Sequence, residues 1–441
     1  MMRTPLLNKK VLVCGFGKTG KAASLFLLKS RAVVSVSDIK NISAPAGIRF
    51  IPQKKLHDKI QDFDLIILSP GIDPRLDFIK SAKKKKIQVL GELEFSFQFI
   101  PRAVKIILVT GTNGKSTVAT LIDRMLKAGD LKSILCGNIG TPVSGIVSRL
   151  EGDEILVIEV SSFQLERHRR KKGFPAEVRI LLNAEPDHLS RYRSFAEYRK
   201  TKEEIFADMR KNDFGISGIP GLRKKNIFTL NNDIFFEGNR IKFSERLKKR
   251  FPDAEDILIQ ESKMTLFFQA NRENIAAARG AVLPFKISAG DIRKTVYEFS
   301  PLAHRLELAG TFKGRKFIND SKATNVSSVL FAVKAVTGPA VLIMGGRDKG
   351  SCYEPLIPCL KNTKKIIAYG ESAGRIRRAI GGKIPVRTAA KFERALELAF
   401  GESRAGDTIL LSPGCSSYDQ YENFEERGKT FKNWVKTLRQ R

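Results

Sequence analysis

One glycine-rich stretch of the chain has the residue types and spacing of a phosphate-binding loop. Residues 105–117 are KIILVTGTNGKST, and an apolar segment continues from Val118. This order predicts a buried strand, a glycine turn and a helix N-terminus, where successive backbone amides bind anions. Lys115 supplies a charge that can reach terminal phosphates, and Ser116 stands where the hydroxyl of such a loop holds magnesium. Val109 occupies the first glycine position of the usual pattern, so the loop is a shortened variant, and a plain strand–helix turn is the alternative.

Polar side chains also mark the ends of two later apolar runs. The run Ile155–Val160 carries Glu159. The run Val178–Leu182 is followed by Asn183 and, shortly after, by His188. A carboxylate in a buried strand is costly unless its charge is compensated, and a magnesium ion would do so. Backbone amides are the alternative partner for Glu159, and a lone histidine is more often a core or surface residue than a ligand.

Residues 194–209 have helical periodicity, and one lysine falls on the apolar face. Lys202 is four residues after Tyr198 and four before Phe206. Burial there would favour the neutral amine. A neutral amine can add carbon dioxide to give a carbamate, which binds metal as an extra carboxylate. A lysine that extends its amine to water is the alternative, and spacing alone favours that alternative.

The first segment carries a second glycine-rich turn. A strand at Lys10–Cys14 precedes the sequence GFGKTG, and a helix is expected over Ala22–Leu28. The next strand, Ala32–Ser37, ends at Asp38, so the order is that of a βαβ unit in which an acid meets a ribose. A further strand, Phe63–Leu68, ends in the turn sequence SPG. The unit fits a dinucleotide cofactor, and a nucleotide-diphosphate ligand uses the same geometry.

The rest of the chain repeats the alternation of strands and helices. Apolar strands near residues 316–318, 340–344, 365–368 and 408–411 each precede a polar or glycine turn. Such an alternation is typical of an α/β domain. We therefore expect three consecutive α/β domains: a Rossmann-like N-terminal domain at 1–97, a P-loop ATPase-like central domain at 98–300, and a Rossmann-like C-terminal domain at 301–441.

The composition limits the classes of binding partner and the cellular compartment that are expected for the protein. The 441 residues include 78 Lys and Arg against 46 Asp and Glu, a formal charge of +32, so nucleic acid or an anionic substrate must be considered. The basic residues are spread along the chain and do not interleave with aromatics, so we expect no nucleic-acid partner. No apolar run has membrane-spanning length, the first residues lack the apolar core of a signal peptide, and the five cysteines have no metal-ligand spacing. We expect a cytoplasmic monomer that does not insert into membranes.

Nine motifs, taken in order, resemble the Mur ligase family, the ATP-dependent amide-forming enzymes of bacterial peptidoglycan synthesis. They are TGTNGKST (110–117), GNIGTP (137–142), IEVSSFQLE (158–166), NAEPDHLSRY (183–192), YRKTK (198–202), HRLE (304–307), NDSKATN (319–325), GGRDKG (345–350) and LSPGCSSYDQYENFEERG (411–428). Within the family, the chain is most similar to the member that adds D-glutamate. The resemblance implies phosphoryl transfer from ATP to the carboxylate of UDP-N-acetylmuramoyl-L-alanine, followed by attack of the D-glutamate amine on the acyl phosphate.

The resemblance also implies roles for particular residues. Ser116 and Glu159 would hold one magnesium ion with the ATP phosphates. His188 and a carbamylated Lys202 would hold a second, and Lys115 would contact the transferring phosphoryl group. The implied ATP site consists of Gly111, Thr112, Asn113, Gly114, Lys115, Ser116, Thr117, Asn271, Asn274, Arg305, Asp320 and Lys322. The implied substrate site consists of Gly17, Lys18, Thr19, Asp38, Ser69, Gly71, Asn138, Ser161 and Gln164 for the nucleotide sugar and its alanine, and of Thr324, Lys349, Ser417 and Phe424 for D-glutamate.

Two residues depart from the family pattern, and other functions stay open. Ala270 stands where a histidine is usual, and Tyr418 stands where a leucine is expected, which puts the shape of the D-glutamate pocket in doubt. One alternative is a family member that adds a different amino acid. A nicotinamide-dependent oxidoreductase is argued from GFGKTG and Asp38, but it leaves Lys115 and Glu159 without a role. The third alternative is a non-catalytic protein that binds nucleic acid.

Overall fold

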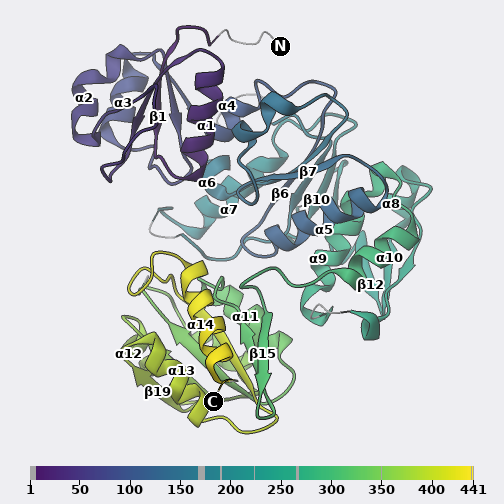
Figure 1. Ribbon diagram of the computed structural model, residues 1–441. Coiled ribbons are helices and arrows are strands. Elements are labelled where there is room, and N and C mark those ends of the chain that lie inside the picture. The colour runs from purple at the N-terminus through teal and green to yellow at the C-terminus, as the bar shows by residue number, and fades with distance from the viewer. Residues whose placement is uncertain are drawn as a thin grey trace. The chain divides into compact units, whose positions relative to one another are not determined.

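The computed structural model describes residues 6–166, 174–188, 191–222, 224–264, 268–348, 350–438 and 440. The chain divides into two compact units. The first comprises Met1–Ala184, Ala196–Ile259 and Asn274–Thr295, and the second comprises Glu185–Phe195, Gln260–Glu273 and Val296–Arg441. Within the described residues the strands form four sheets, three of which are mainly parallel (Figure 1). The predicted α/β class is therefore confirmed.

The N-terminal sheet has the strand order β3-β2-β1-β4-β5, and each neighbouring pair is parallel. Its strands are β1 (Lys10–Cys14), β2 (Val33–Ser37), β3 (Ile48–Phe50), β4 (Leu65–Leu68) and β5 (Gln88–Gly91). Alternate side chains enter two cores, which explains why these strands are apolar on both faces. Helix α1 (Lys18–Lys29) covers one face, and α2 (Leu56–Lys59) and α3 (Asp77–Lys84) cover the other (Figure 1).

The central sheet has the order β11-β10-β9-β6-β8-β7, and all its neighbouring strands are parallel. Its strands are β6 (Lys105–Thr110), β7 (Ser133–Gly137), β8 (Ile155–Glu159), β9 (Val178–Leu181), β10 (Phe214–Ser217) and β11 (Ile227–Thr229). Helix α5 (Lys115–Ala128) follows β6 and packs on β6, β7 and β8. The shorter helices here are α4 (Glu92–Ser96), α6 (Ser162–Leu165) and α7 (Phe195–Glu203).

A small antiparallel sheet follows the central sheet in sequence. Its order is β12-β13-β14, with strands β12 (Ile234–Glu237), β13 (Arg240–Phe243) and β14 (Ile257–Leu258). The sequence did not indicate this sheet, because its strands are only two to four residues long. The helices that follow its strands are α8 (Glu245–Arg250), α9 (Phe268–Ala281) and α10 (Ala289–Glu298).

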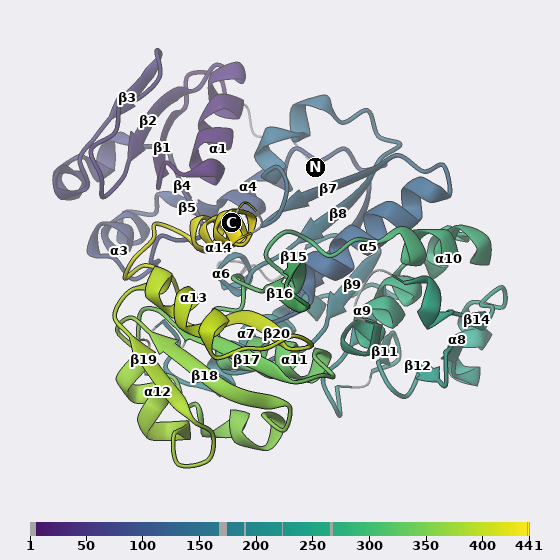
Figure 2. The same cartoon turned by 60° about the horizontal axis from the view of Figure 1, so that its bottom comes forward.

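The C-terminal sheet has the order β15-β16-β20-β17-β18-β19. Its strands are β15 (Glu307–Phe312), β16 (Arg315–Asn319), β17 (Ala340–Gly345), β18 (Thr363–Tyr369), β19 (Val386–Ala389) and β20 (Thr408–Gly414). Only β15 is antiparallel to its neighbour among these described strands. Helices α11 (Val326–Ala335) and α12 (Ala373–Ile380) cover one face, and α13 (Phe392–Gly401) and α14 (Phe424–Leu438) cover the other (Figure 2).

The expected strands after residue 301 all lie within β16, β17, β18 and β20, so that part of the prediction is confirmed.

The prediction of a single helix over residues 194–209 is wrong at its C-terminal end. Helix α7 stops at Glu203, and a short 3-10 helix covers Glu204–Phe206. Ala207 is extended, with ψ of 137°, and its carbonyl accepts a hydrogen bond from Arg179 Nη1 at 2.9 Å. Among the described helices, none combines the length and the apolar character needed to cross a bilayer.

Candidate functional site

The glycine-rich loop joins β6 to α5, as the sequence predicts. Gly114, which directly precedes the first helical residue Lys115, has a φ of 83°, a conformation that favours glycine. A side-chain carbon at Gly114 would overlap the Oδ1 atom of Asn274 on α9. The loop therefore lies directly against Asn274, one of the two asparagines expected at the nucleotide. The other, Asn271, lies on the same helix and is buried.

The amines of two lysines hold the carbonyl groups of this loop. Lys115 Nζ donates to Gly111 O and to Thr112 O, each at 2.8 Å. Lys202 Nζ donates to Gly111 O at 2.8 Å and lies 4.8 Å from the ring centroid of Tyr198. Lys202 is only 1% exposed, so the alternative of a lysine that extends to water is wrong. The carbamate on Lys202 stays a prediction.

Two further residues shape the loop, although nothing in the sequence assigned a role to either of them. Asn183 Oδ1 accepts hydrogen bonds from Thr112 N at 3.0 Å and from Asn113 N at 2.9 Å, and Asn183 Nδ2 donates to Asn113 O at 3.3 Å. The Tyr198 hydroxyl lies 3.1 Å from Thr112 Oγ1. The position of Asn183 just after β9 could have indicated that it lies near the loop, because β9 pairs with β6 and both strands end at the same edge of the sheet.

Glu159 is the last residue of β8, the strand between β6 and β7. It is paired with Val109 of β6, just before the loop, and with Gly137 of β7. Glu159 is 2% exposed, and its Oε1 atom accepts a hydrogen bond from Asn138 Nδ2 at 2.7 Å. This hydrogen bond joins Glu159, which is predicted to bind magnesium, to Asn138, which is predicted to bind the nucleotide sugar. Ser116, in the first turn of α5, is fully buried, and Thr117 is also buried.

Two predicted substrate residues, Ser161 and Gln164, form the N-terminus of α6. Gln164 Oε1 accepts hydrogen bonds from Ser161 N and Ser161 Oγ, each at 2.9 Å. Gln164 N in turn donates to Ser161 Oγ, which completes a capping box. These side chains hold one another in place directly after Glu159 and Val160, so α6 begins at the carboxyl edge of the central sheet.

The predicted nucleotide-sugar residues of the N-terminal sheet surround its glycine turn. Asp38 follows β2, and its carboxylate accepts hydrogen bonds from Phe16 N at 2.7 Å and from Lys40 N at 3.1 Å. Ser69 Oγ donates to Gly15 O at 2.8 Å, which ties the turn after β4 to the turn after β1. Lys18 Nζ donates to Gly140 O of the central segment. Thr19 is partly buried, and Gly17 and Gly71 face open space.

Asp320, Arg305 and Lys322 lie in the second unit, near the end of β16. Leu306 N donates to Asp320 Oδ1 at 3.2 Å, and Ser412 Oγ donates to Asp320 Oδ2 at 2.9 Å. Burial raises the pKa of Asp320 to about 7, although these hydrogen bonds and the charge of Arg305 oppose the rise. Lys322 N donates to the His304 carbonyl, so the segments that carry Arg305 and Lys322 are held together.

His188 also belongs to the second unit, where Asp187 fixes its backbone. Asp187 Oδ1 accepts a hydrogen bond from His188 N at 2.8 Å, and Asn325 Nδ2 donates to Asp187 Oδ2 at 2.8 Å. The backbone of His188 has a φ of 54°, in the left-handed region that residues with a β-carbon seldom adopt. Glu159 and Lys202 belong to the first unit, so the pairing of His188 with them stays a prediction.

Arg427 of α14 is a further candidate that the sequence did not reveal. It is fully buried, and its Nη2 atom donates to Ser321 O at 2.8 Å and to Cys415 O at 3.2 Å. Arg427 thereby connects the turn after β16, which carries Lys322, with the turn after β20. Its spacing could have indicated that Arg427 is buried, because it lies three residues after Phe424 and four before Phe431 on the apolar face of α14.

The residues predicted for D-glutamate are only partly described. Ser417 is buried, and its carbonyl accepts hydrogen bonds from Gln420 N at 3.0 Å and Tyr421 N at 2.8 Å. Thr324 and Phe424 are partly buried. Lys349 lies outside the described residues. Tyr418, which replaces the expected leucine, is 64% exposed.

Models of three protein domains match successive parts of the chain. "Mur ligase MurD-like, N-terminal domain" matches residues 9–91, "Mur ligase middle domain" matches residues 109–278, and "Mur ligase, glutamate ligase domain" matches residues 304–415. The UDP-N-acetylmuramoylalanine–D-glutamate ligase of Koribacter versatilis is 34% identical over 449 residues, which cover 98% of each chain. The ligase of the same name from Acidobacterium capsulatum is 35% identical over 450 residues, which cover 98% of this chain and 96% of the relative.

Solved structures share the fold at lower sequence identity. UDP-N-acetylmuramate–alanine ligase MurC from Thermotoga maritima superposes with a TM-score of 0.62 at 16% identity, over 97% of this chain and 99% of that one. MurF ligase from the same organism, solved in complex with ADP, superposes with a TM-score of 0.59 at 14% identity, over 99% and 97%. At such identities the likeness shows the fold alone.

Proposed function

This chain belongs to the Mur ligase family, and we propose that it is an ATP-dependent ligase that joins D-glutamate to UDP-N-acetylmuramoyl-L-alanine. The product would be a precursor of peptidoglycan. The curated relatives support the amino acid and the acceptor, because they carry that activity in their names and match the chain over nearly its whole length.

The observation that carries the proposal is the arrangement around the phosphate loop. The amines of Lys115 and Lys202 converge on Gly111 O, and Asn274 lies against Gly114. The same loop ends at the N-terminus of α5, a helix of fourteen residues, where backbone amides attract phosphate. A plain strand–helix turn has no need of two buried or partly buried lysine amines, so this arrangement supports nucleotide binding.

The chemical demand is to bring two anions together, the substrate carboxylate and the terminal phosphate of ATP. Lys115 can exchange its bonds to Gly111 O and Thr112 O for bonds to phosphate oxygens, and so offset the repulsion. Asn183 keeps the loop backbone in place while that exchange occurs. The D-glutamate amine then attacks the acyl phosphate, and phosphate leaves from the tetrahedral intermediate.

The residues present fit a magnesium ion. The Ser116 hydroxyl and the Glu159 carboxylate are oxygen donors, and both residues are buried at the end of the β6–β8 pair that carries the loop. Magnesium, when bound, neutralises phosphate charge. We assign Ser116 and Glu159 to one ion, and we keep His188 and carbamylated Lys202 as ligands of a second. A carbamate retains one N–H, so Lys202 could keep its hydrogen bond to Gly111 O after modification.

The three segments of the chain would divide the substrates between them. We propose that residues 1–97 hold the uridine diphosphate, residues 98–300 hold ATP, and residues 301–441 hold D-glutamate. In support, each of the three mainly parallel sheets lies within one of these ranges. The predicted uridine-diphosphate residues Gly17, Asp38 and Ser69 all follow strands of the first sheet.

The test is phosphate release from ATP in the presence of UDP-N-acetylmuramoyl-L-alanine and each member of a panel of D- and L-amino acids. Release should depend on D-glutamate. Lys115→Ala should lower it at least about 100-fold, whereas Lys127→Ala, on the exposed side of the same helix, should leave it unchanged.

Two outcomes would contradict the proposal. Release that depends on another amino acid would favour the different-amino-acid ligase. Absence of release with every amino acid, together with binding of a nicotinamide cofactor, would favour the oxidoreductase.

A further inference from the structure

The last residue of β7, Gly137, and the turn after it (residues 138–142) lie directly against Glu159 at the end of β8. Gly137 is paired with Glu159 across the two strands, and its φ of 100° favours glycine. A side-chain carbon at Gly137 would lie 2.5 Å from the Glu159 carbonyl oxygen, which is too close for any other residue. Asn138 N donates to the same carbonyl oxygen at 2.9 Å. The backbone therefore fixes the point from which the Asn138 side chain starts.

Asn138 binds Glu159 a second time, through its side chain. Its Nδ2 atom donates to Glu159 Oε1 at 2.7 Å, a distance typical of a hydrogen bond to a carboxylate. An ionised carboxylate offers acceptors only, so the amide is oriented with Nδ2 toward Glu159. Glu159 is 2% exposed, whereas Asn138 is exposed, and in the described part of the chain the Asn138 Oδ1 atom makes no hydrogen bond. One short side chain therefore connects a buried carboxylate to the exposed edge of the central sheet.

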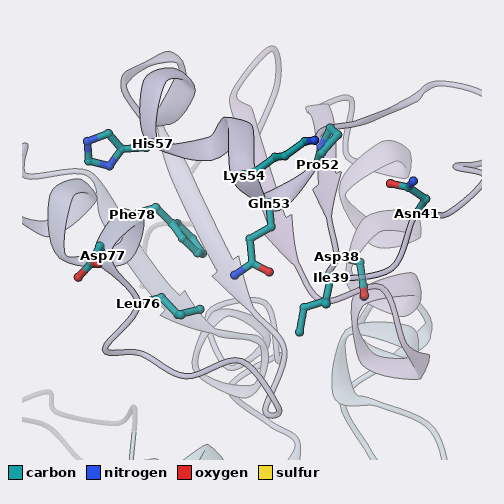
Figure 3. A pocket seen from close by; sticks show the side chains of 10 residues that line it. All are labelled: Asp38, Ile39, Asn41, Pro52, Gln53, Lys54, His57, Leu76, Asp77 and Phe78. Carbon is teal, nitrogen blue, oxygen red and sulfur yellow. The ribbon is translucent and has the colours of Figure 1, made fainter.

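The turn after β7 also contacts the N-terminal sheet. Lys18, the first residue of α1 after the glycine turn, donates from Nζ to Gly140 O. Asp38, which accepts a hydrogen bond from that glycine turn, lines a pocket, and Figure 3 shows the Gln53 side chain extending into it. Because Asp38 is among the residues proposed for the uridine diphosphate, this pocket belongs to that site. The turn after β7 therefore contacts both the proposed nucleotide-sugar site and Glu159.

We propose that Asn138 is a positioning residue for magnesium, and that through it the nucleotide sugar and the magnesium–ATP complex strengthen each other's binding. The Asn138 amide donates to one oxygen of Glu159, which orients the carboxylate before an ion binds. The second N–H of Nδ2 and the Oδ1 atom remain for a polar group of the nucleotide sugar. A nucleotide sugar that orders this amide also orders Glu159, so the two ligands share one entropy cost. The inference rests on the proposed function.

The first test is calorimetric titration of the full chain with AMP-PNP, an ATP analogue that does not transfer its terminal phosphoryl group. The titration is made once with Mg²⁺ and once with EDTA, and the ratio of the Kd in EDTA to the Kd in Mg²⁺ reports the contribution of the metal. Asn138→Ala should lower this ratio about tenfold, a usual effect of losing a group that orients a metal ligand. The Kd in EDTA should stay unchanged. A merely structural role of Asn138 would raise both Kd values and keep their ratio.

The second test adds UDP-N-acetylmuramoyl-L-alanine to the titration with Mg²⁺. In the wild type it should lower the Kd for AMP-PNP about fivefold, at the lower end of typical couplings between two sites. By thermodynamic reciprocity, AMP-PNP with Mg²⁺ should lower the Kd for the nucleotide sugar by the same factor. Asn138→Ala should bring both factors close to one, because the group that the two ligands share is then absent.

Thr141→Ala is the matched control. Thr141 lies in the same turn and is exposed, and within the described residues its side chain makes no hydrogen bond. Its metal ratio and its coupling factor should equal those of the wild type. If both ligands bind but the wild type shows no coupling, or Asn138→Ala keeps either the metal ratio or the coupling, the inference is overturned while the proposed function stands. If the wild type binds neither ligand, the proposed function and the inference are both overturned.

Discussion

Asn183 offers the sharpest test of how the phosphate loop is held in place. Its side chain accepts hydrogen bonds from Thr112 N and Asn113 N and donates one to Asn113 O. Asn183→Ala removes all three. The 3.3 Å bond to Asn113 O is the longest and is left out of the estimate. Thr112 N also donates to the backbone carbonyl of Asn183 at 3.1 Å, and that bond survives the substitution. Only the bond from Asn113 N is lost outright, so the substitution should destabilise the described loop conformation by about 1 kcal/mol.

A loss of about 1 kcal/mol corresponds to a factor of roughly 5 in an equilibrium constant. We therefore expect Asn183→Ala to raise the Kd for ATP about 5-fold and to speed amide exchange of residue 113 by a similar factor. Asn183→Asp separates the two effects. Its carboxylate can still accept from both amides, so exchange should stay slow, while its negative charge should weaken ATP binding.

Hydrogen exchange read by mass spectrometry and calorimetric titration with ATP would measure both effects. Asn362→Ala is the control, because Asn362 also makes two hydrogen bonds to backbone carbonyls, at 3.2 and 3.1 Å, in the second unit. The reasoning would be refuted if Asn183→Ala bound ATP as the wild type does and kept the slow exchange of residue 113.

Three further predictions concern named residues. If Lys202 is carbamylated, phosphate release should fall several-fold in buffer depleted of carbon dioxide and return with bicarbonate, and Lys202→Met should not respond; an unresponsive wild type would argue against the carbamate. Gly114→Ala should lower the free energy of unfolding by about 1–3 kcal/mol, since φ is 83° and the new carbon overlaps Asn274, whereas Gly338→Ala, in open space, should not. Burial raises the pKa of Asp320 from 3.8 to about 7, so its contribution to stability is complete below about pH 4 and is lost as the pH rises through 7. Asp320→Asn should flatten this dependence by up to about 4 kcal/mol in urea unfolding at a series of pH values, and an unchanged pH profile would count against the raised pKa.

The sequence by itself determined the features that depend on neighbouring residues. Apolar runs and glycine turns placed β6, the loop and α5, because strand, turn and helix signals there lie within about ten residues. Helical spacing likewise placed Lys202 on the apolar face of a helix, although spacing alone favoured an amine that extends to water. The alternation of apolar runs and turns after residue 301 predicted the parallel strands of the C-terminal sheet. The antiparallel sheet of β12, β13 and β14 escaped detection, because strands so short carry no periodicity.

Only the tertiary structure decided which distant residues meet. Asn183 contacts the loop because β9 pairs with β6, although seventy residues separate the partners. Arg427 bonds Ser321 across 106 residues, and Gln53 enters a pocket bounded by three separate segments. Local propensity carries no information on strand order or on which buried polar group satisfies another. Strand order and the pairing of buried polar groups depend on contacts between residues that are distant in the sequence, because each buried donor needs an acceptor.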